Sequence, residues 1–378
     1  MIRHALSLSL LVASLGASLS AQEWSSDFTK AGLTGRCFSL GTYGGDLIAG
    51  GQAFQHDGRR IDGIARFDGN TWHPIGTVSA LGAGGLVRAI VEWNGELYAA
   101  GEFPIIGGTL ANAVARWDGS QWHPLGTGLT DQWGWSSAVH ALAVYQGELY
   151  AGGMFASAGG QPIPGLARWN GSSWRPVGGG LTAHPSYGPR VTALHAATDG
   201  KLYIGGSFYG SGGVSSANLI AWDGTAFSAV GGGIPLTVST FVFAIDEYQG
   251  DLVVGGNFGA IGSLIVDNVA RFDGQQWHAL DGGVRDWAIG VAVHSLQVWQ
   301  GSLYVGGDFV DVGPSGNTTP ALRVARWDGQ WHGIGGISGS DLTTTAIAMT
   351  QWNDELVVGG EFSVAGTTIG IGQSVVST

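Results

Sequence analysis

The heptapeptide Leu149-Tyr-Ala-Gly-Gly-Met-Phe155 returns with small changes along the whole chain. The leucines that begin its copies are Leu47, Leu97, Leu149, Leu202, Leu252, Leu303 and Leu356, so successive copies lie about 51 residues apart. Chance does not hold a seven-residue pattern in register over so long a chain. Repetition at such a period indicates one structural unit used many times.

A second string follows six of the seven copies. In the second copy it reads Val114-Ala-Arg-Trp-Asp-Gly-Ser-Gln-Trp122, and its counterparts begin at Ile64, Leu166, Leu219, Val269 and Val324. In the third copy the two strings predict four short strands, at 139–145, 148–155, 166–169 and 173–178. Gln146-Gly147 and Asn170-Gly171 mark tight turns, and Asx-Gly pairs favour type I′ hairpins because both central residues need a positive φ. Each unit is therefore predicted to be a four-stranded antiparallel meander.

Such a sheet cannot bury both of its faces alone, and even repetition of four-stranded sheets is typical of a β-propeller. We expect an all-β chain with seven blades, at about 36–77, 86–127, 137–179, 190–232, 240–283, 292–336 and 344–378. The last blade lacks a Trp-bearing fourth strand, and residues 22–29, which contain Trp24, are expected to supply it and close the ring. A six-bladed ring with a degenerate first unit is the alternative.

The N-terminal segment and the composition predict the location of the protein. Residues 1–21 have a short basic start, an apolar run from Leu6 to Leu15 and small residues ending at Ala21, which is typical of a secretory signal peptide. Residues 22–378 are then one secreted domain, extracellular or periplasmic. No later apolar run is long enough to cross a membrane. The formal net charge of −12 argues against binding to nucleic acid or anionic lipid.

Residues that every repeat carries are expected to be structural. Tryptophans at equivalent places should fill the space between blades, and the Gly-Gly pairs should let the backbone pass close to a neighbouring ring. The repeated arginines, Arg66, Arg116, Arg168, Arg271 and Arg326, are expected to hold loop carbonyls. His73, His123, His278 and His332 should lie too far apart to share a metal. Cys37 stands where other repeats have valine, so it is expected to be a small buried apolar residue.

The same residues carry a family resemblance. A Gly-Gly pair closing strand two, an aromatic residue in strand three and a Trp in strand four resemble the kelch repeat. The full string resembles the extracellular repeats of fungal cortical cell-polarity marker proteins and of uncharacterised exported bacterial proteins. The interval between the aromatic residue and the Trp is shorter than in typical kelch repeats, so the chain is kelch-like. This resemblance implies a propeller that serves as a binding platform.

Enzyme motifs are missing from the sequence. The copper-dependent galactose oxidases need a Tyr cross-linked to a Cys, whereas the only cysteine here is the repeat-equivalent Cys37. Sialidase Asp-boxes separate Asp and Gly by one residue, whereas Asp118-Gly119 are adjacent. No Ser nucleophile elbow, His-Glu-x-x-His or phosphate loop occurs. We therefore expect no catalytic residue, no metal and no cofactor.

The residues that break the repeat are the candidate binding residues. Long connections should gather on one face, where four aromatic residues of variable loops suit a sugar or a protein partner: Trp133, Trp135, Tyr187 and Trp287. Near the axial opening stand the cationic residues Arg36, Arg88, His140, Arg190 and His294, which suit a carboxylate or an acidic glycan. The alternative is that the aromatic residues cap the core and the cations form scattered ion pairs.

These observations predict a secreted, monomeric, non-enzymatic module that binds a protein or carbohydrate ligand through its long-loop face. The alternative is an extracellular carbohydrate-active hydrolase or lyase, which a pair of carboxylates within roughly 5–10 Å on that face would favour. A structural role at the cell surface is a third hypothesis.

Overall fold

The computed structural model describes residues 33–76, 78–79, 85–182, 188–235, 240–286, 291–338, 344–362, 364–365 and 376–377. The expected signal peptide and the expected closing strand at 22–29 lie outside these residues. Every regular element in the described part of the chain is a β-strand, as predicted.

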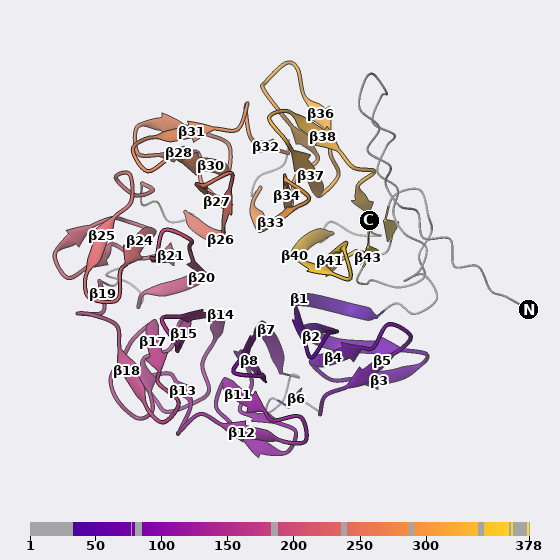
Figure 1. The fold of residues 1–378 in the computed structure, drawn as a ribbon, viewed down its shortest axis with the longest axis vertical. Helices are drawn as coiled ribbons and strands as arrows, with labels where there is room; N and C mark the ends of the chain where they lie inside the picture. The colour runs from indigo at the N-terminus through magenta and orange to yellow at the C-terminus, as the bar shows by residue number, and fades with distance from the viewer. Residues whose placement is uncertain are drawn as a thin grey trace, which may run out of the picture.

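The larger sheets are antiparallel, and each follows the chain outward from its first strand (Figure 1). The first sheet consists of β1 (Thr34–Tyr43), β2 (Asp46–His56), β4 (Ile64–Phe67) and β5 (Trp72–Pro74), with β3 (Arg59–Ile61) on β2; the second of β7 (Leu86–Trp93), β8 (Glu96–Glu102), β11 (Val114–Trp117) and β12 (Trp122–Pro124); and the third of β14 (Val139–Tyr145), β15 (Glu148–Gly153), β17 (Leu166–Trp169) and β18 (Trp174–Pro176). The fourth consists of β20 (Arg190–Ala196), β21 (Leu202–Ser207), β24 (Leu219–Trp222) and β25 (Phe227–Ala229), and the fifth of β26 (Phe241–Tyr248), β27 (Asp251–Asn257), β30 (Val269–Phe272) and β31 (Trp277–Ala279). The sixth consists of β33 (Val293–Trp299), β34 (Ser302–Gly307), β37 (Val324–Trp327) and β38 (Trp331–Gly333), and the last of β40 (Thr345–Trp352), β41 (Glu355–Glu361) and β43 (Val376–Ser377).

Short ribbons connect neighbouring sheets. In five of them the segment after one sheet pairs with the loop between strands two and three of the next sheet, as β13 pairs with β16. The strands of the ribbons are β6 (Val78–Ser79), β9 (Ile105–Ile106), β10 (Thr109–Leu110), β13 (Leu129–Thr130), β16 (Ser157–Ala158), β19 (Leu181–Thr182), β22 (Gly210–Ser211), β23 (Val214–Ser215), β28 (Ala260–Ile261), β29 (Leu264–Ile265), β32 (Val284–Arg285), β35 (Asp311–Val312), β36 (Thr319–Pro320), β39 (Ile337–Ser338) and β42 (Val364–Ala365).

The first strand of each larger sheet faces the central axis and carries a shift in register near its start. In β14, Val139 pairs with Gly153 and Ala141 pairs with Gly152, so His140 has no partner of its own. Such a bulge bends a strand and turns the extra residue out of the ladder. Glycine is required opposite it, because a Cβ on Gly153 would lie 2.2 Å from the carbonyl oxygen of Ala138.

The first glycine of each Gly-Gly pair brings two sheets together. A Cβ on Gly152 would lie 2.4 Å from Cγ1 of Val191, which belongs to the next sheet. Gly359 stands in the same relation to Cys37, whose side chain is 2% exposed. At these two positions the expectation of a neighbouring ring was therefore wrong, since the nearest side chain is a valine or a cysteine. The expectation that Cys37 is a small buried residue is confirmed.

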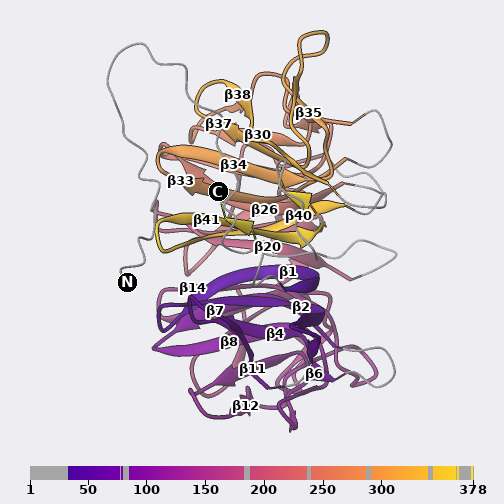
Figure 2. The ribbon, with the colours of Figure 1, turned by 90° about the vertical axis from the view of Figure 1, so that its right-hand side faces the viewer.

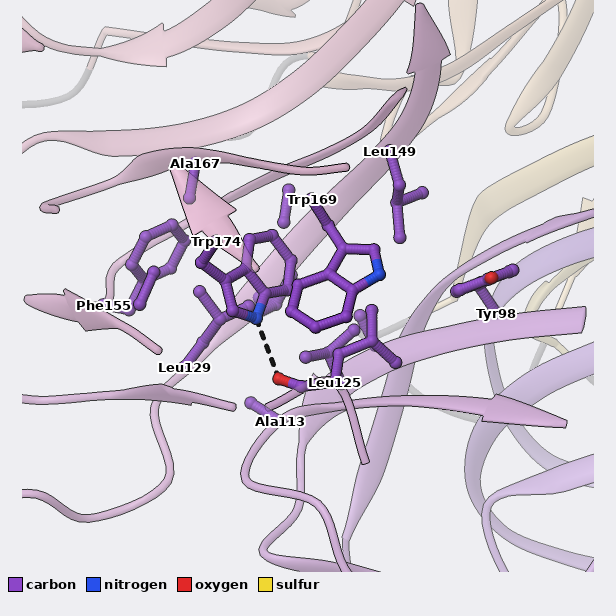
Figure 3. Close-up of a cluster of buried hydrophobic side chains, with 14 of the residues drawn as sticks. Tyr98, Ala113, Leu125, Leu129, Leu149, Phe155, Ala167, Trp169 and Trp174 are labelled. Atoms are coloured by element: carbon purple, nitrogen blue, oxygen red, sulfur yellow. Dashed lines mark hydrogen bonds between the residues drawn. The ribbon is translucent and has the colours of Figure 1, made fainter. Parts of the chain in front are cut away.

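Four strand-four tryptophans link their sheet to the one before it. Trp174 Nε1 donates a hydrogen bond of 2.9 Å to the carbonyl oxygen of Leu125, and its ring packs beside Trp169 (Figure 3). Trp122, Trp277 and Trp331 make the equivalent bonds to Ile75, Gly231 and Leu280. The expected role of these tryptophans in packing between sheets is confirmed.

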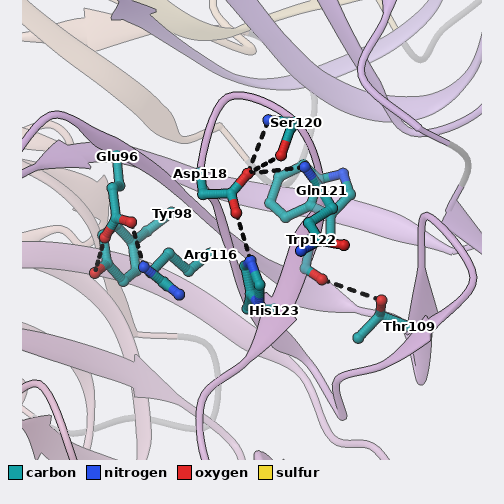
Figure 4. A network of polar contacts seen from close by, with 9 residues as sticks. All are labelled: Glu96, Tyr98, Thr109, Arg116, Asp118, Ser120, Gln121, Trp122 and His123. Atoms are coloured by element: carbon teal, nitrogen blue, oxygen red, sulfur yellow. Dashed lines mark hydrogen bonds and ion pairs between the residues drawn. The ribbon is translucent and has the colours of Figure 1, made fainter.

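The repeated arginines and histidines stabilise their own hairpins. Arg116 forms an ion pair with Glu96 at the start of strand two, and His123 lies 2.6 Å from the carboxylate of Asp118 (Figure 4). The hydrogen bond from His123, with those from the backbone of Gln121 and Ser120, holds the pKa of Asp118 well below its usual range. The arginines therefore pair with carboxylates and not with the loop carbonyls expected from the sequence.

The turn between strands one and two differs in backbone conformation from the turn between strands three and four. Gln146 and Gly147 have φ of 48° and 76°, which fits the type I′ turn between strands one and two. Between strands three and four, Gly171 has a φ of 96° but Asn170 does not have a positive φ. The type I′ prediction is wrong for Asn170-Gly171, because the Asn170 side chain instead accepts the backbone N–H groups of Ser172 and Ser173.

Candidate functional site

A cavity of about 880 Å³ lies where the bulged residues of the innermost strands converge. Each of these strands contributes its extra residue to the lining, namely Phe38, Arg88, His140, Thr192, Phe243, His294 and Ile347. In the sequence repeat these seven residues stand at one equivalent position. The bulge explains why they point away from the strand pairing and toward the axis.

The cavity lies at the end of the sheets that carries the long connections. Strand one begins and strand two ends there, so the remaining lining comes from these ends and from the loops: Met154, Arg190, Phe241, Asp286, Val291, Asp308, Arg323, Thr344 and Thr345. The tight turns between strands one and two lie at the opposite end. Figure 2 shows the ribbon strands β6 and β35 on the same side of the molecule. We call this end the loop face.

Most charged groups at the cavity are paired with a group of opposite sign. Arg88 Nε donates a hydrogen bond of 2.6 Å to Glu102 and its guanidinium lies 4.9 Å from the centre of the Phe38 ring. His294 lies 2.7 Å from Asp308. Burial opposes ionisation of Asp308, but the hydrogen bond and charge of His294 lower its pKa overall. Arg88 and His294 therefore each have an acidic partner.

Asp286 and Arg323 form the deepest ion pair of the cavity. Arg323 Nη1 lies 3.3 Å from Asp286 Oδ2, and both side chains are 17% exposed. The two acids that line the cavity, Asp286 and Asp308, are therefore each held by a cation.

Arg190 and His140 differ from the other cationic residues. Within the part of the chain that the structure describes, no carboxylate pairs with either of them, and Arg190 Nε and His140 Nε2 are buried without a hydrogen-bond partner. Arg190 lies 5.3 Å from the centre of the Phe241 ring. Burial lowers the pKa of His140 to about 4, helped by the charges of Arg88 and Arg190, so His140 is neutral at pH 7.

Aromatic side chains form one wall of the cavity. Phe241 and Phe243 lie 5.5 Å apart with nearly parallel rings, and His294 lies 5.2 Å from Phe243. An apolar wall beside a few polar groups is the usual construction of a site for a small molecule, and the cavity volume falls in the usual range.

The structure brings together only some of the residues predicted from the sequence. Arg88, His140, Arg190 and His294 line one cavity, whereas Arg36 is absent from its lining and pairs with Glu361 at 2.9 Å. Trp133 and Trp135 lie on the loop before β14, away from the cavity lining, with 74% and 66% of their surface exposed. Tyr187 and Trp287 lie outside the described residues.

The loop that carries the two exposed tryptophans is held by Asp131. Its carboxylate accepts the backbone N–H groups of Trp133 and Trp135, each at 2.9 Å. The backbone N–H of Asp131 in turn donates to the carbonyl of Trp135. The two indole rings are therefore presented to solvent by an ordered turn.

Sequence reasoning overlooked the acids and the methionine that stand beside the cations. Glu102, Met154, Asp308 and Glu361 all occupy the variable place in Gly-Gly-x-Phe or its Ala-Gly variant. The signal was present in the repeat, because this place lies directly after the glycine that faces the bulge.

The described residues give no sign of a metal site, since no group of three or more His, Cys, Asp and Glu side chains is placed to hold an ion. No helix in the same part of the chain has the length and apolar character needed to cross a membrane.

Comparison with known proteins establishes the fold. A family model described as a β-propeller domain of unknown function, DUF5122, matches residues 197–220. The chain is a β-propeller. No curated protein matches it in sequence.

Three solved structures share this propeller. The extracellular domain of the proposed one-component system BT4673 from B. thetaiotaomicron is 11% identical with a TM-score of 0.58, over 95% of this chain and 40% of that one. The extracellular domain of the proposed hybrid two-component system BT3049 from the same organism is 11% identical with a TM-score of 0.51, over 91% and 40%. The WD40 propeller domain of Doa1 is 13% identical with a TM-score of 0.50, over 92% and 95%. The chain thus spans about two-fifths of the length of the solved B. thetaiotaomicron domains, and the likeness is one of fold.

Proposed function

We propose that this propeller is a secreted, non-enzymatic binding module that takes its ligand on the loop face. The observation that carries the proposal is the open axial cavity. There Arg190 and His140, which have no carboxylate partner in the part of the chain that the structure describes, stand beside an aromatic wall. Buried polar groups without partners are rare in folded proteins, and a ligand that pairs with them gains both hydrogen bonds and charge.

The proposed ring has seven kelch-like blades and is closed by residues 22–29. Two observations support it. The innermost strand β40 packs on β1, which places the last sheet beside the first (Figure 1). Trp72 Nε1 is buried and has no acceptor among the described residues, whereas its equivalents bond to the preceding sheet. In three of those bonds the acceptor lies three residues after the preceding strand-four Trp, so we propose that the acceptor for Trp72 is near Asp27, three residues after Trp24.

Export rests on residues 1–21, which we propose are a signal peptide cleaved after Ala21. The extracellular domains of BT4673 and BT3049 share the propeller fold, which is compatible with an extracellular or periplasmic monomer here.

Between the two ligand classes, the geometry favours a glycan over a protein. A concave cavity of this volume suits a sugar residue, and the ordered, exposed Trp133 and Trp135 give flat apolar rings on which a sugar face can stack. A protein ligand would instead require a broad interface of about 800 Å² on each partner.

A carbohydrate-active hydrolase or lyase is the second candidate, because Asp286 and Asp308 both line the cavity. A general acid needs a raised pKa, whereas the pKa of Asp308 is lowered by His294 and Arg323. This electrostatic arrangement favours binding.

The test is a glycan array probed with the purified chain, followed by mass spectrometry of each bound glycan. We expect binding without cleavage, and weaker binding after Trp133→Ala with Trp135→Ala. Lys201→Ala, near a turn at the opposite end, is the control and should bind as the wild type does. Cleavage that disappears in Asp286→Asn with Asp308→Asn would instead establish the hydrolase or lyase, and no binding to any glycan would reject the proposal.

A further inference from the structure

Comparison of Arg190 with the equivalent arginine of another sheet shows that Arg190 lacks an acidic partner among the described residues. Arg190 and Arg36 occupy equivalent places, each two residues before the bulge of its strand. Arg36 pairs at 2.9 Å with Glu361, which follows the Gly-Gly pair of the preceding sheet. The residue equivalent to Glu361 in the sheet before Arg190 is Met154.

Met154 also explains why His140 has no carboxylate partner among the described residues. Bulged cations in two other sheets pair with the residue after the Gly-Gly position of their own sheet, as Arg88 does with Glu102 and His294 with Asp308. In the sheet of His140 this residue is again Met154. Because Met154 and not an acid stands at this place, neither Arg190 nor His140 has a carboxylate partner among the described residues.

Both groups and the methionine face the same space. Met154, Arg190 and His140 all line the axial cavity, and Met154 is 43% exposed. Arg190 lies over the Phe241 ring, and Phe243 stacks on Phe241. A guanidinium and an imidazole N–H beside an apolar wall match a carboxylate attached to a ring-shaped body.

We propose that Arg190 and His140 form a carboxylate-binding subsite, in which the ligand supplies the carboxylate that neither group has among the described residues. The subsite rests on the proposed function and names the ligand class as an acidic glycan, whose uronic acid carries the carboxylate. A free organic acid has the same chemistry and is the other source. Arg190 supplies the charge, and neutral His140 supplies one hydrogen bond.

The test is calorimetric titration of the purified chain with trigalacturonate, with its methyl ester and with benzoate. The ester keeps the sugar but removes the charge, so we expect it to bind at least about tenfold more weakly than the acid, as the loss of a charge-assisted hydrogen bond implies. Benzoate carries the carboxylate without a sugar and should bind more weakly than trigalacturonate.

Three variants separate the subsite from the rest of the cavity. Arg190→Gln should remove the preference for the acid over the ester. Met154→Glu should do the same by supplying the missing partner, and its melting temperature should equal or exceed that of the wild type, which shows that it is folded. Arg36→Gln, at the equivalent but already paired arginine, should bind as the wild type does.

The outcomes are distinguishable from those of the proposed function. Equal affinity for acid and ester, no binding of either acid at millimolar concentration, or wild-type affinity in Met154→Glu would overturn the subsite. Binding of neutral glycans on the array would still support the module in those cases. Binding of benzoate equal to that of trigalacturonate would keep the carboxylate subsite but reject the acidic glycan as its ligand.

Discussion

Trp174 donates its indole N–H to the carbonyl oxygen of Leu125 across 2.9 Å, and the two residues belong to neighbouring sheets. Both groups are buried, and the bond recurs with the same geometry at Trp122, Trp277 and Trp331. At these four junctions, neighbouring sheets are joined by a directional bond as well as by apolar packing.

Replacing Trp174 with Phe should destabilise the protein by about 1–3 kcal/mol, because the carbonyl of Leu125 is left buried without a donor. Urea denaturation followed by circular dichroism measures the change. Trp133→Phe removes an indole N–H that is exposed, and it should change stability by less than about 0.5 kcal/mol. Equal losses in the two variants would contradict the role assigned to the bond.

Deleting residues 22–30 should lower the melting temperature sharply if these residues complete the last blade. The deletion would also remove the acceptor proposed for Trp72, so Trp72→Phe should cost less stability in the truncated chain than in the full one. Replacing 22–30 by Gly and Ser of equal number controls for length. An unchanged melting temperature would reject this closure of the ring.

Cys37 should be inert in the folded protein. Its side chain is 2% exposed and burial raises the pKa of the thiol to about 12, so the reactive thiolate is scarce. A thiol reagent should modify it only in denaturant. Cys37→Val should change stability by less than about 1.5 kcal/mol, since valine packs against glycine at the equivalent contacts, whereas Cys37→Leu should cost about 1–3 kcal/mol. Rapid labelling of the native protein would show that the packing is looser than described.

The free energy of unfolding should decrease as the pH is lowered below about 6.5, in part because of His140. Its pKa is about 4 in the folded protein and 6.5 in the reference state, so the unfolded chain binds more protons between these values. Stability therefore rises with pH across this window, by up to about 3 kcal/mol from this residue. His140→Gln should lose that part of the slope in denaturation curves measured from pH 4 to 7. Parallel curves for the two proteins would mean that His140 is solvated.

Local features were predictable because they repeat. The strands, the Gly-Gly pairs and the tryptophans follow from side-chain types that every unit requires for the same packing. The bulged position was also visible, since Arg88, His140 and His294 stand at one place in the repeat. The type of turn at Asn170-Gly171 could not be predicted from the repeat. Its type depends on the hydrogen bonds that the Asn170 side chain accepts from nearby backbone N–H groups.

By itself, the sequence determined the all-β fold, its four-stranded units and the set of cations near the axis. Only the tertiary structure decided which of those cations are paired. Arg36 pairs with Glu361, and Arg190 lines the axial cavity together with Met154, because neighbouring sheets bring together residues that are remote in the chain. Charge balance at the axis depends on these distances between sheets, which no local pattern contains. Among the described residues it leaves Arg190 and His140 without an acidic partner.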